Sequence, residues 1–267
     1  MRFAVALSAL FACLAWPMPA VAQAPDTVFL EDMTWVEVRD AIAAGKTTII
    51  IPTGGTEQNG PHMVLGKHNY LVKYKAGEVA KRLGNALVAP VVAYVPEGDV
   101  TPPTGHMRFA GTITTPQDVF AKVLEYAARS FKQHGFTDIA LMGDSGGNQA
   151  GQKLVAELLN KEWAATPVRV HHLTDYYPGR GDDWVVSQGV SAADVGSHAG
   201  THDTSSLMYL NPSMLRVDKM GPGKSGDGQG HVGNPAKATA LFGKRILEMQ
   251  IEDAANQIQR LRVSSRK

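Results

Sequence analysis

The chain has 267 residues, of which 44% are hydrophobic and 19% are charged, and its formal net charge is +1. This length allows one large α/β domain or two small domains, and the apolar content is enough for a sizeable core. No basic stripe or run of Lys and Arg occurs before the short tail at 260–267, which argues against nucleic acid as a partner.

The first residues have the pattern of a secretory signal. One Arg precedes an apolar run that ends in a small-x-small cleavage signal at 20–22. The run is short and interrupted by Pro, which does not suit a transmembrane span. We therefore expect residues 1–22 to be removed and residues 23–267 to form one domain, in the periplasm or outside the cell and with no membrane partner. Lipoprotein processing at Cys13 is the rival interpretation; cleavage after Ala22 would remove this only Cys.

Short apolar runs alternate along the chain with amphipathic ones. The first strand-like run, TTIIIPTGG, is rich in β-branched residues and ends in Pro and Gly, as expected of a strand buried on both faces. Alternation of this kind predicts an α/β fold with a mostly parallel sheet flanked by helices. The predicted elements are strand 47–55, helix 69–84, strand 86–96, helix 115–135, strand 137–143, helix 148–163, strand 166–174 and a closing helix 234–262.

Polar loops follow two of the predicted strands. GGTEQNGPH comes after the first strand and GDSGGNQ after the strand at 137–143. Ligands of parallel sheets bind at the carboxyl ends of the strands, so these loops are candidates for a site. The Gly-rich stretch at 219–235 is expected to be mobile or to cover that site.

The second of these loops contains GDSGG at 143–147, which reads like the nucleophile loop of trypsin-type proteases. A helix-rich chain without disulfides does not suit that fold. The strand–turn–helix setting and the two flanking glycines do fit a nucleophile elbow. A serine hydrolase that uses Ser145, with Asp175 and His198 as partners, is therefore an alternative.

Histidines are few, yet they gather with carboxylates in the loops between predicted elements. Imidazole and carboxylate are ligands that suit zinc and manganese, and a bound metal would lower the pKa of its water. The pattern favours a metal-dependent hydrolase. The residues concerned are Glu57, His62, His68, His106, Asp144, His198, His202 and Asp203.

Ordered motifs from about Trp35 to the closing helix resemble those of the creatininase (creatinine amidohydrolase) family. The family's Glu-Gln-His-Gly-Pro-His-Leu-Pro-Leu-x-Thr-Asp loop corresponds to EQNGPHMVLGKH at 57–68. The other matches are Gly-Thr-Ile in FAGTIT at 109–114, Asn-Gly-His-Gly-Gly-Asn in GDSGGN at 143–148, His-Ala-Gly-x-x-Glu-Thr-Ser in HAGTHDTS at 198–205, and a closing Gly-x-Pro-x-x-Ala stretch within 230–248. The resemblance implies the creatininase-like layered fold.

The resemblance also implies a metal centre, from which this chain departs. In the family the loop Glu, the His two residues on and the Asp eleven residues on bind two metals, with the Asp bridging. Here Glu57 is kept, whereas Asn59 and His68 stand at the other two positions, and a later metal His corresponds to Ser145. Neutral Asn and Ser are poor zinc ligands. The expected rebuilt centre holds one or two divalent ions, zinc or manganese, through Glu57, His68, Asp144 and His202.

The expected function is metal-dependent hydrolysis of a non-peptide C–N bond in a cyclic or small amide. His198 corresponds to the family His that handles the proton, and we expect it to act as general acid/base. Asp203, in place of a family Glu, is the second expected catalytic residue; His106, Ser145 and Trp184 are expected to contact substrate. The resemblance implies a homo-oligomer, often a hexamer in the family. A metal-free relative that only binds a small molecule is a further alternative.

Overall fold

The computed structural model describes residues 26–177 and 179–264, so the predicted leader at 1–22 lies outside the described residues. A four-stranded sheet in the order β2-β1-β3-β4 forms its centre, and all three strand pairings are parallel. The prediction of a parallel sheet flanked by helices is confirmed. The strands are β1 (Thr48–Thr53), β2 (Ala86–Val88), β3 (Asp138–Gly143) and β4 (Arg169–His172).

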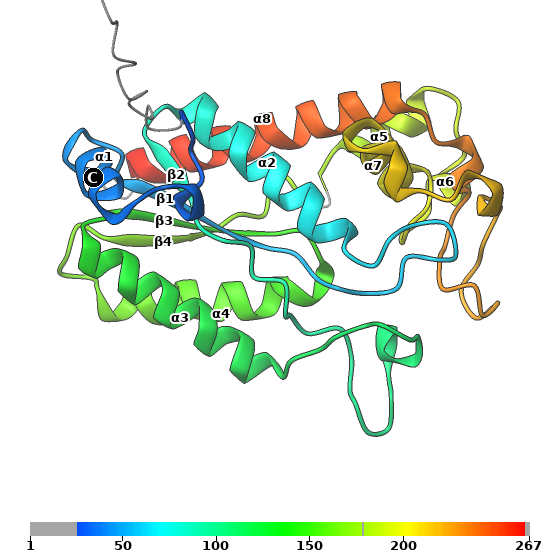
Figure 1. The fold of residues 1–267 in the computed structure, drawn as a ribbon, viewed down its shortest axis with the longest axis horizontal. Helices are drawn as coiled ribbons and strands as arrows, with labels where there is room; N and C mark the ends of the chain where they lie inside the picture. The colour runs from blue at the N-terminus through cyan, green and yellow to red at the C-terminus, as the bar shows by residue number, and fades with distance from the viewer. Residues whose placement is uncertain (1–25, 178, 265–267) are drawn as a thin grey trace, which may run out of the picture.

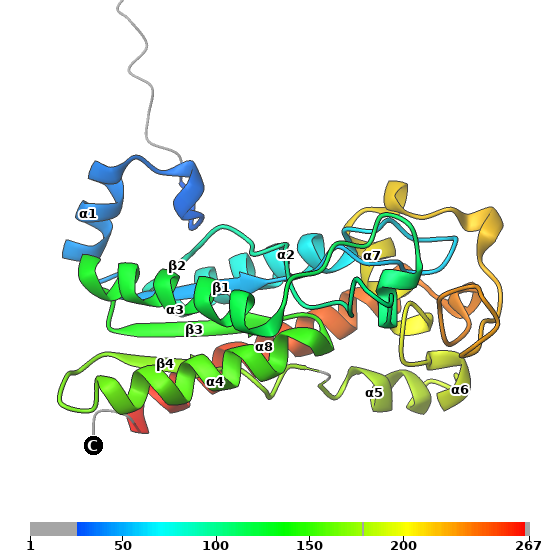
Figure 2. The same cartoon turned by 90° about the horizontal axis from the view of Figure 1, so that it is seen from below.

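Helices cover both faces of this sheet (Figure 1). The helices α2 and α8 lie over one face, while α3 and α4 lie over the other (Figure 2). Short helices gather beyond one end of the sheet, where the site described below is built. The bounds are α1 (Trp35–Ala43), α2 (Lys67–Leu83), α3 (Gln117–His134), α4 (Gly146–Glu162), α5 (Gly181–Ser187), α6 (Ala192–Val195), α7 (Thr201–Leu210) and α8 (Ala240–Ser264).

The apolar strands contribute side chains to a hydrophobic core on each face of the sheet. Along β1, Ile49 and Ile51 pack in the cluster with α3 and α4, while Ile50 packs in the cluster with α2 and α8. This alternation follows from the two-residue period of a strand. Each such Ile side chain contributes about 1.5–3 kcal/mol on full burial, so the central strands are held rigidly and fix the positions of the loops at their ends.

Two predicted elements differ in extent from the structure. β2 ends at Val88 rather than reaching residue 96, because Pro90 lacks the N–H that a continuing ladder would need. The closing helix begins at Ala240 rather than at residue 234, since Pro235–Lys237 forms a separate 3-10 turn capped by Asn234.

Several helices were not predicted at all, and α7 is the most important of them. Its sequence THDTSSLMYL carries little apolar periodicity because the buried residues include Thr204, Ser205 and Ser206. A helix that buries hydroxyls on its inner face gives no hydrophobic signal of the usual kind. Residues 198–205, expected as a loop, therefore divide between a loop and the start of α7.

The contact between α7 and α8 depends on a glycine. A Cβ added to Gly243 would lie 1.9 Å from the backbone oxygen of Ser205, which no side-chain adjustment can relieve. We expect Gly243→Ala to destabilise the protein by about 1–3 kcal/mol or more, as overpacking does. Urea denaturation checks this, with Gly221→Ala as the control because a Cβ there meets nothing within 4 Å. Equal stability of the two variants would contradict the tight helix contact.

Across residues 26–177 and 179–264, no helix is both long and apolar enough to cross a membrane.

Candidate active site

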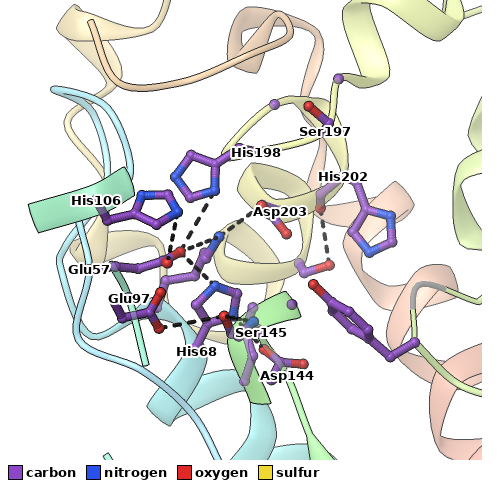
Figure 3. A pocket seen from close by; sticks show the side chains of 18 of the residues that line it. Glu57, His68, Glu97, His106, Asp144, Ser145, Ser197, His198, His202 and Asp203 are labelled. Carbon is purple, nitrogen blue, oxygen red and sulfur yellow. Dashed lines mark hydrogen bonds and ion pairs between the residues drawn. The ribbon is translucent and has the colours of Figure 1, made fainter. Parts of the chain in front are cut away.

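A cavity of about 510 Å³ lies at the carboxyl ends of the strands (Figure 3). Loops after β1 and β3, the first turns of α2, α4 and α7, and the connection between β2 and α3 all contribute to its wall. This is the edge at which parallel sheets bind ligands. Its polar lining includes Glu57, Lys67, His68, Lys75, Glu97, His106, Asp144, Ser145, His198, His202 and Asp203.

Three of the residues predicted as metal ligands meet in one hydrogen-bonded row. His68 Nε2 lies 2.8 Å from Glu57 Oε1, and His68 Nδ1 lies 3.0 Å from Asp144 Oδ2. Burial and Lys67 would lower the pKa of His68, but the two carboxylates outweigh them and raise it. With a carboxylate at each ring nitrogen, the geometry calls for an imidazolium that donates from both. The structure thus brings Glu57, His68 and Asp144 together, while their role as metal ligands stays a prediction.

A buried lysine stands beside this row. The side chain of Lys67 has no exposed surface, and its Nζ lies 2.8 Å from Asp203 Oδ2 and 3.9 Å from Glu57 Oε1. Burial would lower the pKa of Lys67, but these carboxylates raise it above its ordinary value. Burial would likewise raise the pKa of Asp203, and Lys67 instead holds it well below the usual carboxyl range.

A second buried lysine, Lys75, is two helical turns further along α2. Its Nζ is paired with Asp144 Oδ1 and lies 3.3 Å from Gln250 Oε1 on α8. Burial would raise the pKa of Asp144, yet Lys75 and His68 lower it. Asp144 is therefore an ionised carboxylate that lies between the side chains of Lys75 and His68.

Glu97 supplies a carboxyl group of a different kind. It is hydrogen-bonded to Glu57, and burial together with the charge of Glu57 raises the pKa of Glu97 to about 10. Burial would raise the pKa of Glu57 too, but His68 and Lys67 hold it well below the ordinary value. These shifts keep Glu97 protonated and Glu57 ionised at neutral pH.

Gln58 determines which nitrogens of two histidines carry hydrogen. The backbone N–H of Gly60 donates to Gln58 Oε1 at 3.0 Å, so the amide NH₂ faces His106 Nδ1 at 2.9 Å. His106 must then carry its hydrogen on Nε2, which lies 3.2 Å from Glu57 Oε2. His198 Nε2 lies 2.8 Å from the backbone oxygen of Gln58 and 3.3 Å from the Gln58 amide nitrogen, and the shorter contact makes it a donor to the oxygen. These assignments follow from the partners.

His198 is consequently left with a free lone pair on Nδ1. That atom lies 3.7 Å from Glu57 Oε1, on the cavity side (Figure 3). Burial, followed by the nearby Lys67, lowers the pKa of His198 to about 4, so the ring is neutral at physiological pH. A neutral imidazole here can accept a hydrogen bond from a water or substrate.

The other predicted site residues are placed as follows. Ser145 caps α4 by accepting from the N–H of Gly147, and its hydroxyl lies 3.5 Å from Glu97 Oε1. His202 lines the cavity from α7, but its Nδ1 is bonded to Asp182 rather than to the Glu57 cluster. Trp184 on α5 packs edge-on against Phe242 with ring centroids 5.7 Å apart and is not part of the cavity lining described.

The serine-hydrolase alternative lacks its triad in this geometry. Asp175 is paired with Arg260 on α8, and His198 is bonded to the Gln58 carbonyl. The hydrogen bonds described for Ser145 involve Glu97 and the start of α4 and include no imidazole. Within the described part of the chain, Ser145 therefore has no imidazole positioned to activate it as in a Ser-His-Asp triad.

The fit of the site to a metal centre can be tested residue by residue. Glu57, His106 and His198 each offer a ligand atom within 4.8 Å of the others and form a candidate three-residue metal site. However, Gln58 places a hydrogen on His106 Nε2, so in this arrangement that atom has no lone pair to give. A metal there would require the Gln58 amide to turn.

The positions implied by the family resemblance fit a two-ion centre even less. Asn59 is buried, and its NH₂ donates to the backbone oxygens of Glu57 and Val64. His68 has both ring nitrogens engaged by carboxylates, and the Ser145 hydroxyl caps a helix. The residues present therefore do not fit the family's two-ion arrangement, and the mechanism below assigns no step to a metal.

Sequence reasoning missed Lys67, Lys75 and Glu97. One signal was available for Lys75, because it lies on the face of α2 that also carries His68, Leu71, Val72 and Ala76, all of them buried. A lysine on an apolar helix face needs a buried partner. Glu97 follows the short strand β2 at a distance that no local pattern marks.

Comparison with known proteins agrees with the fold. The sequence model of the creatininase family, described as creatinine amidohydrolase, matches residues 31–258. Among solved structures, a creatinine amidohydrolase (creatininase) superposes with a TM-score of 0.75 at 23% identity and covers 88% of this chain and 98% of the other. A creatininase described as the Mn form gives a TM-score of 0.74 over the same shares.

Two curated relatives show the range of named activities. The mycofactocin precursor peptide peptidase of Mycolicibacterium smegmatis is 27% identical over 234 residues, 79% of this chain and 84% of that protein. The creatinine amidohydrolase of Pseudomonas putida is 25% identical over 205 residues, 73% and 76% of the two chains. With the family match spanning most of its length, and hydrolases among its relatives, the chain belongs to the creatininase family.

Proposed function

We propose that this protein hydrolyses a C–N bond in a small polar or cyclic amide, and that the Glu57–Glu97 pair performs the acid–base chemistry. The named activities of the relatives, a peptidase and an amidohydrolase, support hydrolysis at a C–N bond. The observation that carries the proposal is the presence of the Glu57 and Glu97 carboxyl groups in one cavity lining, with Lys67 and His68 beside Glu57 only; this setting lowers the pKa of Glu57 and raises that of Glu97 to about 10. A carboxylate beside a carboxylic acid can take a proton from water and give one to substrate.

In the proposed reaction, Glu57 accepts a proton from water as the water oxygen attacks the carbonyl carbon. The neutral His198 accepts a hydrogen bond from the same water through Nδ1, which faces Glu57 across 3.7 Å. Glu97 then donates its proton to the leaving nitrogen as the C–N bond breaks. The hydrogen bond between the two carboxyl groups returns the proton from Glu57 to Glu97, so the products are a carboxylic acid and an amine.

The surrounding charges keep Glu57 ionised and Glu97 protonated, as the proposed reaction requires. Lys67 and His68 hold Glu57 ionised, whereas burial and the charge of Glu57 keep the proton on Glu97. Because its pKa is lowered to about 4, His198 is neutral at pH 7, and of the general acid/base role expected from the family resemblance we propose only the accepting part. We therefore assign it the orientation of water, and Asp203 the positioning of Lys67.

The proposed function is tested with a substrate panel. Purified protein is incubated with creatinine, five- and six-membered cyclic amides and short peptides, and amine or acid release is measured. Turnover that Glu57→Gln abolishes and Ser145→Ala largely retains supports the carboxyl pair. Labelling by a fluorophosphonate, with loss of turnover in Ser145→Ala, would instead establish the serine hydrolase.

Gly55 makes room for the proposed acid. A Cβ added to Gly55 would lie 2.4 Å from Glu97 Oε1, so Gly55→Ala must displace that carboxyl group from its present position. We expect kcat to fall about 100-fold, the low end of what an acid–base group contributes. Steady-state kinetics measure this, and an unchanged circular dichroism spectrum shows that the fold is kept. Wild-type turnover in Gly55→Ala would count against Glu97 as the acid.

Two further proposals accompany this function. The leader at 1–22 supports export to the periplasm or beyond, which fractionation of cells expressing the full chain would test. The family resemblance supports a homo-oligomer, which light scattering on the purified protein would measure.

A further inference from the structure

The cavity contains a cation of its own. The ammonium group of Lys67 is fully buried and has two carboxylate neighbours, Asp203 at 2.8 Å and Glu57 at 3.9 Å. Lys67 is the first residue of α2, where the helix dipole disfavours positive charge. Burying a cation at that position requires strong compensation from anions, and these two carboxylates provide it.

We propose that the Lys67 ammonium is the resident cation of this site and takes the place of a divalent metal between Glu57 and Asp203. The inference deepens the proposed function, since it assigns the positive charge of the same cavity. It can nevertheless be tested without any substrate.

The balance of charge in the cavity supports this assignment. The buried carboxylates of Glu57 and Asp144 and the partly exposed carboxylate of Asp203 face the buried lysines Lys67 and Lys75 and the doubly hydrogen-bonded ring of His68. The anions are therefore already matched by cations from the chain, and a divalent ion would add uncompensated positive charge in a buried region.

The available donor atoms lead to the same conclusion. His68 presents a carboxylate to each ring nitrogen, and His106 carries a hydrogen on the atom that faces Glu57. Among the residues that the structure describes, His198 Nδ1 and the carboxylate oxygens remain as lone-pair donors near Glu57. These are the atoms that an ion would use if the ammonium were removed.

The experiment begins with the wild-type protein, purified without chelator. Metal analysis is expected to find well below one zinc or manganese ion per chain, and EDTA or added zinc is expected to leave Tm unchanged. One tightly bound ion per chain, with a loss of Tm in EDTA, would overturn the proposal. This measurement needs no variant and is independent of hydrolytic activity.

Lys67→Met provides the second arm, because it keeps an unbranched side chain that is one atom shorter and removes its charge. Glu57 and Asp203 then lose the ammonium group between them, and Glu57 keeps only its contact with His68 as compensation on that side. We expect added zinc or manganese to raise the Tm of this variant by roughly 5 °C or more at an excess of metal over the dissociation constant. Lys73→Met is the matched control, since Lys73 lies on the same helix but is half exposed and pairs with Glu31 on the surface.

The outcomes separate the two proposals. A Lys67→Met protein that folds and gains no stability from either ion would overturn the assignment of Lys67 as the substitute cation. If that variant does not fold, the metal analysis of the wild type decides alone. A metal-free wild type that cleaves no amide in the panel would remove the proposed function and leave the assignment of Lys67 intact.

Discussion

Glu57→Gln is expected to lower kcat about 1000-fold, within the range of a general base that contacts the reacting water. The amide is nearly the same size as the carboxylate but cannot accept the proton, and it cannot exchange a proton with Glu97. His68 and Lys67 also lose an anionic partner, so Tm is measured alongside the initial rates. A variant that folds and keeps more than a tenth of wild-type kcat would show that Glu57 is not the base.

The pH profile of the wild-type enzyme provides the complementary check. Glu97 must be protonated to act, so kcat is expected to fall as the pH rises through about 10. Glu57 must be ionised, and since its pKa is held well below the ordinary value, the acidic limb is expected below the usual carboxyl range. Glu97→Gln should lose most activity together with the alkaline limb. An alkaline limb that survives in Glu97→Gln would assign that titration to another group.

Asp144→Asn is expected to destabilise the folded protein by about 3–5 kcal/mol, the cost of removing one partner from a buried ion pair. The change leaves the buried ammonium of Lys75 without its carboxylate and removes one of the two acceptors of His68. Urea denaturation at pH 7 measures the loss. A variant as stable as the wild type would contradict the buried ion pair.

The double variant Lys75→Met/Asp144→Asn isolates that pair. If Asp144 acts mainly by compensating Lys75, removing both charges should recover part of the stability, with a coupling energy of about 1–3 kcal/mol. The pKa of Asp144 is lowered in the folded state, so its contribution is present above the ordinary carboxyl pKa and is lost as the pH falls through the folded value. Asp144→Asn should therefore flatten the acid side of the stability profile.

The strands and the long amphipathic helices could be predicted because their signals are local. β1 has a short apolar run rich in β-branched residues, and β3 has a short apolar run that ends in Gly. The Gly after Leu83 and after His134 ends α2 and α3 as expected. The helix α7 could not be found in this way, since its buried face is made of hydroxyls. Its first turn carries Asp203, so the position of Asp203 beside Lys67 could not be predicted either.

The sequence by itself determined the family, the parallel sheet with helices on both faces, and the convergence of Glu57, His68 and Asp144, because each rests on periodicity or on ordered motifs. Only the tertiary structure decided which charged side chains lie beside Glu57, His68 and Asp144. Lys67 and Lys75 belong to the same helix as His68, yet their effect depends on carboxylates from three other segments. Charge compensation in a buried site depends on the distances between the charged groups and on their removal from water. Neither can be predicted from residues that are adjacent in the sequence.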